Sequence, residues 1–180
     1  MLKDVERLDT LVNHVLEATR LENIAKNYGL KEFNLKELIE ESKDIIIRRY
    51  NLSNDNFKTN IKIELIKSDP TALQLVIINI LDNAVKYSFD NIKIDIESFI
   101  DKNNKICIII KDYGIGIPNS ELNKVFRRFY RIPGKTENKK GSGLGLFIVK
   151  ENIKNLKGKV EVFSEGLNMG TKFKITIPNK

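Results

Sequence analysis

SDPTALQLVIINILDNAVKY, residues 68–87, predicts a largely apolar helix. Asp69 is a suitable N-cap, and Pro70 suits the first helical position because an amide hydrogen there would have no partner within the helix. Apolar residues then recur at helical spacing, which indicates that most of the helix surface is buried; they are Leu73, Val76, Ile77, Ile80, Leu81 and Ala84. We expect the helix to end at about Ser88.

Three polar side chains lie together on one narrow face of this apolar helix. At about 100° per residue, Asn79, Asn83 and Lys86 fall within a stripe roughly 60° wide. The stripe is either the solvated face of an ordinary amphipathic helix or a site for Mg²⁺ and phosphate. In the second interpretation an Asn carbonyl takes one position on the metal, and the ammonium of Lys86 neutralises phosphate charge.

The segments around this helix predict a sheet and further helices. Alternating apolar residues predict strands at 61–66, 91–100, 105–113, 159–165 and 171–177. Helical spacing predicts helices at 33–50 and 119–126, and a third that follows a glycine-rich turn and ends near Leu156. This order predicts an α+β fold, in which helices cover one face of a mixed, largely antiparallel sheet.

KDYGIGIP, residues 111–118, places a carboxylate at the end of a predicted strand, before alternating glycines. Asp112 could simply cap a turn in which Gly114 has a positive φ. Alternatively, Gly114 and Gly116 let a flat ring approach the backbone. Asp112 would then accept a hydrogen bond from an exocyclic amine, while Ile115 and Ile117 pack on the ring.

VFRRFYRI, residues 125–132, combines aromatic and cationic side chains. Phe126 and Phe129 either belong to the core or clamp the end of a short helix. Arg127, Arg128 and Arg131 are either solvated or reach phosphate oxygens with their planar guanidinium groups.

KKGSGLGLFIVK, residues 139–150, begins a helix with alternating glycines at 141, 143 and 145. Glycine costs about 1 kcal/mol relative to alanine inside a helix, so these glycines do not serve helix stability. They leave bare backbone at a helix N-terminus, which favours an anion such as a polyphosphate. The pattern is neither a Walker loop nor the dinucleotide fingerprint, and alone it is weak evidence.

Composition indicates a soluble globular domain of ordinary size, with 180 residues, 41% hydrophobic and 31% charged. The longest apolar run, residues 73–81, is too short to span a bilayer, and the charged N-terminus is not a signal peptide. The lone Cys107 fits a buried, reduced thiol, so we expect a cytoplasmic location. Net charge is +7, and residues 124–140 carry seven Lys or Arg against one acid, Glu137.

The order and spacing of these motifs resemble a known family. The chain carries NxxxNxxKY, then DxGxGI, a Phe-Arg segment, GxGLGL, and a final hairpin ending in GTxF. Over residues 33–178 this resembles the catalytic ATP-binding domain of bacterial sensor histidine kinases, in the superfamily shared with DNA gyrase, heat-shock chaperone ATPases and MutL. The resemblance implies a two-layer α/β sandwich of the Bergerat type, which binds ATP and Mg²⁺.

The resemblance also implies a role for each motif residue. Asn83 matches the Mg²⁺ ligand, Asn79 its polar neighbour, and Lys86 the phosphate-binding lysine. Asp112 matches the aspartate that reads adenine, and Arg131 an arginine near the terminal phosphate; with Asn83 and Lys86, Arg131 completes the expected catalytic set. Residues 131–142 match a mobile lid. The other positions expected to bind the nucleotide are Tyr87, Gly114, Ile115, Gly116, Ile117, Phe126, Phe129, Tyr130, Lys140, Gly141, Ser142, Gly143, Leu144, Gly145, Leu146 and Thr171.

Residues 1–28 predict one amphipathic helix, separate from a catalytic domain at 29–180. The helix resembles the second helix of the family's dimerisation and phosphotransfer domain. The family's phosphoacceptor lies in an H-E-L-R-T-P-like run that is absent here, and His14 lies off the apolar seam with no acidic neighbour. We therefore expect a protein-histidine kinase domain whose acceptor histidine is on a separate phosphotransfer domain.

The resemblance implies further partners in two-component signal transduction. They are a response regulator receiver domain and, for the full-length protein, a second copy in a homodimer. A membrane-anchored parent protein is compatible with this picture.

Two other classes of function compete with this interpretation. Conformational ATPases of the same superfamily carry a glutamate four residues before the Mg²⁺-binding asparagine, but Asn79 occupies that place and an amide cannot accept a proton from water. A nucleic-acid module could use the basic residues 124–140. That reading leaves Asn79, Asn83 and Asp112 unexplained, so no nucleic acid is expected.

Overall fold

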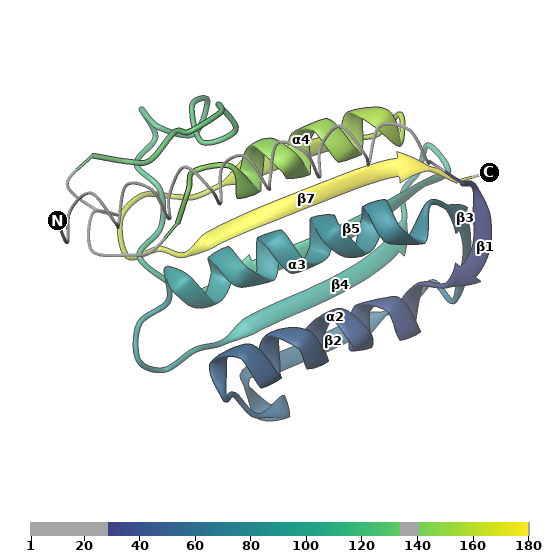
Figure 1. Cartoon of the computed structure of the whole chain (residues 1–180), viewed down its shortest axis with the longest axis horizontal. Helices are drawn as coiled ribbons and strands as arrows, with labels where there is room; N and C mark the ends of the chain where they lie inside the picture. The colour runs from purple at the N-terminus through teal and green to yellow at the C-terminus, as the bar shows by residue number, and fades with distance from the viewer. Residues whose placement is uncertain (1–28, 134–140, 180) are drawn as a thin grey trace, which may run out of the picture.

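The computed structural model describes residues 29–133 and 141–179. Its elements are β1 Lys31–Asn34, α2 Leu35–Tyr50, a 3₁₀ turn Asn54–Asn56, β2 Phe57–Ile61, β3 Leu65–Ser68, α3 Pro70–Lys86, β4 Ile94–Ile100, β5 Lys105–Asp112, α4 Gly145–Asn155, β6 Lys159–Phe163 and β7 Thr171–Pro178. Five strands form one sheet in the order β2-β4-β5-β7-β6. Helices α2, α3 and α4 lie across one face of this sheet, with α3 in the middle (Figure 1).

The strand pairing confirms the predicted mixed, largely antiparallel sheet. Strand β2 runs parallel to β4, and every other neighbouring pair in the five-stranded sheet is antiparallel. Ile96, Ile110 and Phe173 face one another across β4, β5 and β7, and each is at most 3% exposed. Because side chains alternate between the faces of a strand, this row is buried under the helices.

Helix α3 has the predicted cap and nearly the predicted length. The carboxylate of Asp69 accepts a hydrogen bond from the amide of Ala72 at 2.7 Å, and Pro70 is the first helical residue. The second carboxylate oxygen of Asp69 accepts a hydrogen bond from the amide of Gly29 at 2.8 Å, so the same side chain also holds the start of the described chain in place. The helix ends at Lys86, two residues before the expected end.

The predicted helix at 33–50 begins two residues later than expected. Asn34 is its N-cap, because its side-chain oxygen accepts from the amides of Lys36 and Glu37. Phe33 belongs instead to β1, which pairs with β3 in a separate two-stranded sheet. This pairing joins segments about thirty residues apart, so local spacing gave no sign of it.

Two other predictions were wrong. The segment 61–66 is not one strand, since β2 ends at Ile61 and β3 begins at Leu65 in the other sheet. The segment 119–126 is a series of turns, with bonds such as Lys124 N–H to the carbonyl of Glu121, rather than a helix. In the first case the chain passes from one sheet to the other between Ile61 and Leu65, so one alternating run supplies two strands.

The remaining predicted elements are confirmed. The antiparallel pair β4–β5 and the closing pair β6–β7 form where expected, and α4 follows the glycine-rich turn. The helix predicted at 1–28 lies outside the described residues. Among the helices of the described part, none is long and apolar enough to cross a bilayer.

Candidate functional site

A cavity of about 210 Å³ lies between α3, the N-terminal end of α4 and the loop that follows β5. It brings together residues from across the sequence. Its lining residues are Asn79, Asp82, Asn83, Lys86, Tyr87, Asp112, Ile115, Gly116, Ile117, Val125, Tyr130, Arg131, Ile132, Gly141, Ser142, Gly143, Gly145, Leu146, Thr171 and Phe173. The cavity is therefore the point where most of the predicted motifs meet.

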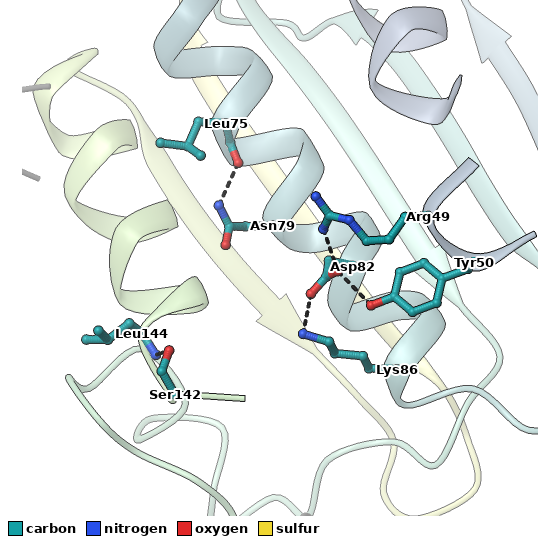
Figure 2. A network of polar contacts seen from close by, with 8 residues as sticks. All are labelled: Arg49, Tyr50, Leu75, Asn79, Asp82, Lys86, Ser142 and Leu144. Carbon is teal, nitrogen blue, oxygen red and sulfur yellow. Dashed lines mark hydrogen bonds and ion pairs between the residues drawn. The ribbon is translucent and has the colours of Figure 1, made fainter. Parts of the chain in front are cut away.

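The amide stripe of α3 faces the cavity, as its spacing predicted. The side-chain nitrogen of Asn79 donates to the carbonyl oxygen of Leu75 at 2.8 Å, which turns its own oxygen toward the start of α4 (Figure 2). One turn further on, Asn83 lines the cavity, and its side chain has no hydrogen-bond partner among the described residues. The amide of Asn83 is thus available to a ligand.

Lys86 does not extend freely into solvent but is held by Asp82, which was not among the predicted site residues. Its ammonium lies 2.6 Å from Oδ2 of Asp82, one helical turn earlier (Figure 2). The other carboxylate oxygen, Oδ1, accepts from Tyr50 and Arg49 at the end of α2. The i, i+4 spacing of Asp82 and Lys86 was a visible signal for their ion pair. The contribution of α2 was not visible in the sequence.

Asp112 ends β5 on the buried side of the sheet. Its Oδ1 accepts from the backbone amides of Gly114 at 2.9 Å and Thr171 at 3.1 Å, and the residue is 4% exposed. Burial raises its pKa to about 6, although these hydrogen bonds and the Thr171 hydroxyl act in the opposite direction. The expected turn cap therefore exists, and the same carboxylate also lines the cavity.

The loop after Asp112 is fastened to the end of α3. The amide of Ile115 donates to the carbonyl oxygen of Tyr87 at 2.9 Å, and the amide of Gly170 donates to the carbonyl oxygen of Gly114 at 3.1 Å. A Cβ at Gly114 would collide with the carbonyl oxygen of Tyr87 and lie 2.8 Å from its carbonyl carbon. Gly114 is thus required by a close approach of two backbone segments, beside the cavity rather than in its lining.

Two tyrosines and an arginine contribute to the cavity rim. Burial raises the pKa of Tyr87, and the positive charge of Arg131 partly offsets this effect. The hydroxyl of Tyr130 donates to the carboxylate of Glu121, and this bond raises the pKa of Tyr130. Both phenols are therefore neutral near pH 7.

The three glycines at the start of α4 and in the turn before it are required to different degrees by close contacts within the protein. Gly143 has φ +73°, and a Cβ there would lie 2.8 Å from the carbonyl carbon of Phe129. A Cβ at Gly145 would lie 2.9 Å from Oδ1 of Asn79, so this glycine lets α4 approach the amide stripe of α3. Gly141 has no atom within 4 Å of such a Cβ. Thus contacts within the protein already account for Gly143 and Gly145, before any ligand is considered.

Some predicted site residues lie elsewhere. Phe126 packs into the core, edge-on to Phe173 with ring centroids 6.4 Å apart, so the core alternative is correct for it. Phe129 is 47% exposed, with the guanidinium of Arg128 stacked over its ring. Leu144 is fully buried and absent from the cavity lining. Lys140 and most of the predicted lid lie outside the described residues.

Besides Asp82, three further lining residues were missed from the sequence. Val125, Ile132 and Phe173 supply apolar surface to the cavity. Phe173 had a detectable signal, because it alternates with Thr171 on β7 and therefore points to the same face of the sheet. Val125 and Ile132 lie in irregular chain, where no period predicts which way a side chain points.

The cavity can hold a ligand that is apolar and flat at one part and anionic at another. The sheet side offers Ile117, Phe173 and the buried acceptor Asp112. The helix side offers the amides of Asn79 and Asn83 and the start of α4, with the ammonium of Lys86 nearby. No group of three or more His, Cys, Asp or Glu suited to a metal occurs among the described residues.

A family model described as histidine kinase-, DNA gyrase B-, and HSP90-like ATPase matches residues 68–180. This match covers more than half of the chain, including α3, the glycine motifs and the closing hairpin. The chain therefore belongs to this family of ATP-binding domains.

Its relatives narrow the class further. Sensor protein RprX of Bacteroides fragilis is 33% identical over 180 residues, covering 97% of this chain and 34% of RprX. Sensor protein kinase WalK of Staphylococcus saprophyticus is 32% identical, covering 98% of this chain and 29% of WalK. The chain is thus a catalytic domain of the sensor histidine kinase type, and it spans about a third of the length of these relatives.

Solved structures agree with this assignment. The mycobacterial sensor histidine kinase MprB aligns with a TM-score of 0.73 and 27% identity, covering 84% of this chain and 99% of that chain. The catalytic domain of the histidine kinase ThkA aligns with a TM-score of 0.71 and 28% identity, covering 84% and 96%. The α+β fold and its helix-covered sheet are therefore those of histidine kinase catalytic domains.

We predict that Gly114→Ala destabilises the protein, whereas Gly141→Ala does not. A methyl group at 114 must push the loop away from Tyr87, and overpacking of this kind costs about 1–3 kcal/mol. For a domain of this size each kcal/mol lowers the melting temperature by about 2–4 °C. Thermal melts of the two variants beside the wild type measure the difference, and equal melting temperatures would contradict the close approach at Gly114.

Proposed function

We propose that this cavity binds Mg-ATP and presents its γ-phosphate to a histidine on a separate phosphotransfer domain. The observation that carries the proposal is a buried carboxylate, Asp112, in the same cavity as the amide stripe of α3 and the glycine turn before α4. One part suits an adenine ring and the other suits a polyphosphate. The names of the relatives, sensor protein RprX and sensor protein kinase WalK, support a role in signalling.

Asp112 reads the base in this proposal. Its Oδ1 already accepts two backbone amides, so we assign Oδ2 to the exocyclic amine of adenine. Ile115 and Ile117 pack against the ring, and Thr171 stands beside the carboxylate in the register pair Asp112–Thr171. Guanine has a carbonyl oxygen where adenine has the amine. It would set two acceptors against each other away from water, which is costly.

The phosphates and the metal lie against α3 and α4 in this proposal. Asn83 fits a Mg²⁺ ligand because its amide lines the cavity and has no hydrogen-bond partner among the described residues. Mg²⁺ commonly keeps several waters and takes only one or two protein ligands, so a set without clustered acids is compatible. When bound, it spreads the negative charge of the phosphates. Lys86 and Arg131 add cationic charge, and the first amides of α4 point at the same region.

Asn79 favours transfer to a histidine over hydrolysis. Its amide nitrogen is held by Leu75, so only a carbonyl oxygen faces the start of α4, and that oxygen is a very weak base. The part of the chain that the structure describes therefore offers no general base for water at this position of α3. In the proposed reaction the domain holds the nucleotide in line with an incoming imidazole nitrogen and excludes solvent.

The proposed reaction needs an acceptor histidine and a final receiver. The 180 residues contain no H-E-L-R-T-P-like run, so we assign the acceptor histidine to a dimerisation and phosphotransfer domain outside them, and we propose that the phosphoryl group then passes to a receiver domain. The alignment with RprX covers 97% of this chain, so it extends over most of residues 1–28. This extent supports the interpretation of those residues as part of the same kinase module, in which we assign them to the dimerisation helix; a homodimer in the cytoplasm remains part of the proposal.

Asn83→Ala should abolish the Mg²⁺-dependent part of ATP binding. The variant removes the one protein oxygen assigned to the metal and leaves the core unchanged, so its melting temperature should stay within about 2 °C of the wild type, as expected for a substitution facing solvent in the cavity. Calorimetry with ATP, with and without Mg²⁺, measures the effect. A matched control is Asn155→Ala, at the other end of α4, which should bind as the wild type does. Undiminished Mg-ATP affinity in Asn83→Ala would remove Asn83 from the metal site.

Phosphotransfer should occur between chains but not within this one. With γ-labelled ATP the chain alone should remain unlabelled, because His14 lacks the surrounding residues of an acceptor. A separately produced phosphotransfer domain with an acceptor histidine should gain an acid-labile label, and Asn83→Ala should prevent this. Label on His14, or phosphate release without any labelled domain, would contradict the proposed reaction.

Asp112→Asn should reduce the preference for ATP over GTP. The amide oxygen can replace Oδ1 in the turn, so the fold should persist, while the amide nitrogen places a donor where Oδ2 stood. Loss of an acceptor from a buried base contact costs about 1–3 kcal/mol, so the ATP-to-GTP ratio should fall by about tenfold or more. Competition of both nucleotides against a fluorescent adenine nucleotide measures the ratio. An unchanged ratio would restrict Asp112 to its turn.

The raised pKa of Asp112 adds a pH test of the same role. Because the free protein holds this carboxyl at a pKa of about 6 and adenine binds its ionised form, affinity should rise as pH increases through 6 and level off above it. Between about pH 7 and pH 5 the loss should reach about tenfold. Phosphate groups of ATP titrate in the same range, so Asp112→Asn is the control: only the extra dependence of the wild type belongs to Asp112.

A further inference from the structure

Asp82 occupies a central place beside the proposed phosphate site without a role in the mechanism above. Its carboxylate lies between two helices, with donors on both sides. Figure 2 shows Lys86 on the side of α3 that faces α4, and Arg49 and Tyr50 approaching from α2. The side chain of Asp82 is only 16% exposed although it lines the cavity.

We propose that Arg49, Tyr50 and Asp82 form a positioning unit that holds the ammonium of Lys86 at the phosphate end of the cavity. The inference rests on the proposed function, in which Lys86 contacts the phosphates of ATP. Asp82 does not touch the nucleotide in this proposal. It acts through Lys86, and Arg49 and Tyr50 act through Asp82.

The two carboxylate oxygens of Asp82 bond to different helices. Oδ2 lies 2.6 Å from the ammonium of Lys86, and Oδ1 accepts from Tyr50 at 2.7 Å and from Arg49 at 2.9 Å. Two short bonds on Oδ1 fix the plane of the carboxylate, so Oδ2 points in one direction. A lysine side chain is a flexible chain of four carbons, so without the bond to Asp82 the ammonium of Lys86 would sample many positions. Its ammonium carries three donors, so one bond to Asp82 leaves two for phosphate oxygens.

The charge balance at the site also depends on Arg49 of α2. A lone carboxylate in the lining of a phosphate site would repel the ligand. Arg49 and Lys86 together bring two positive charges to one negative charge, so the cluster is net positive. Tyr50 adds a neutral donor, which satisfies the carboxylate without adding a further side-chain charge.

Tyr50 keeps its proton in this arrangement. Burial and the bond to Asp82 raise the pKa of Tyr50, so its hydroxyl remains a donor to Asp82 across the physiological range.

The packing of α2 makes the anchor rigid. Tyr50 is the last residue of α2 and packs against the core, and Asn51 ends the helix in the left-handed conformation with φ 52°. Ser42 and Ile46 on the same helix are fully buried. The position of Lys86 is thus tied through Asp82 to α2, a helix that contributes no residue to the cavity lining.

A simpler alternative is that the cluster only joins α2 to α3. A second bridge between the same helices makes a matched control, because Gln74 donates to Glu41 at 3.2 Å without lining the cavity. If the cluster merely joins the helices, breaking either bridge should affect stability and leave nucleotide binding alone. If it positions Lys86, only the Asp82 cluster should affect binding, and only for ligands that carry phosphates.

The test compares ATP with adenosine, both in competition against a fluorescent adenine nucleotide. Asp82→Asn keeps the shape but loses the ion pair, and should weaken ATP binding by about five- to tenfold while leaving adenosine within twofold, the range expected for a coupled charged pair. Tyr50→Phe keeps the ring packing and should weaken ATP binding about two- to threefold. Gln74→Ala should leave the affinity for both ligands unchanged.

A double variant separates a positioning role from a direct one. If Asp82 acts through Lys86, Asp82→Asn combined with Lys86→Met should bind ATP no more weakly than Lys86→Met alone. Additive losses, tighter ATP binding in Asp82→Asn, or equal losses for ATP and adenosine would each overturn the proposal. If Asp82→Asn does not fold, Tyr50→Phe decides by the same ATP-to-adenosine criterion. Failure of the wild type to bind ATP more tightly than adenosine would instead contradict the proposed function.

Discussion

The structure depends on one helix, α3, that must serve the core and the cavity at once. It lies between α2 and α4 on the sheet, and its residues Leu73, Ile77, Ile80 and Leu81 have no exposed surface. Burial on this scale fixes the rotation of the helix about its axis, because turning it would expose several large side chains to water. The remaining face is narrow, and its two amides, Asn79 and Asn83, lie next to Gly145 at the start of α4. Core packing thus orients the proposed metal and phosphate ligands.

A second constraint is the register of the sheet. Asp112 pairs with Thr171. This pair lies two residues along β5 and β7 from the buried row of Ile96, Ile110 and Phe173, and therefore on the same face of the sheet. Because side chains alternate, a slip of one residue in β5 would turn the carboxylate to the opposite face of the sheet. The carboxylate also accepts from the amides of Gly114, in the loop that follows β5, and of Thr171, at the start of β7, so base recognition and loop geometry depend on the same group. Its raised pKa is the consequence of placing it on the buried face.

The cavity is built from two kinds of structure. Regular elements supply Asn79, Asn83 and Asp112, while the turns around 127–133 and 141–144 supply the opposite wall. Gly143 lets the two turns approach each other, and Gly145 lets the start of α4 approach Asn79 of α3; no larger residue would fit at either place without displacing backbone or Asn79. The rigid part fixes where the base and the metal would lie.

The sequence by itself determined the features that depend on neighbours along the chain. These include the cap of α3, the stripe of Asn79 and Asn83, the two antiparallel strand pairs and the order of motifs that identified the family. Local steric and hydrogen-bonding preferences decide them, so a short window contains the information. Only the tertiary structure decided that Phe33 starts a separate sheet, that Phe126 is core while Phe129 is surface, and that Arg49 and Tyr50 reach Asp82. Those outcomes depend on contacts between segments about thirty or more residues apart, and no local pattern states which distant segment will supply the partner.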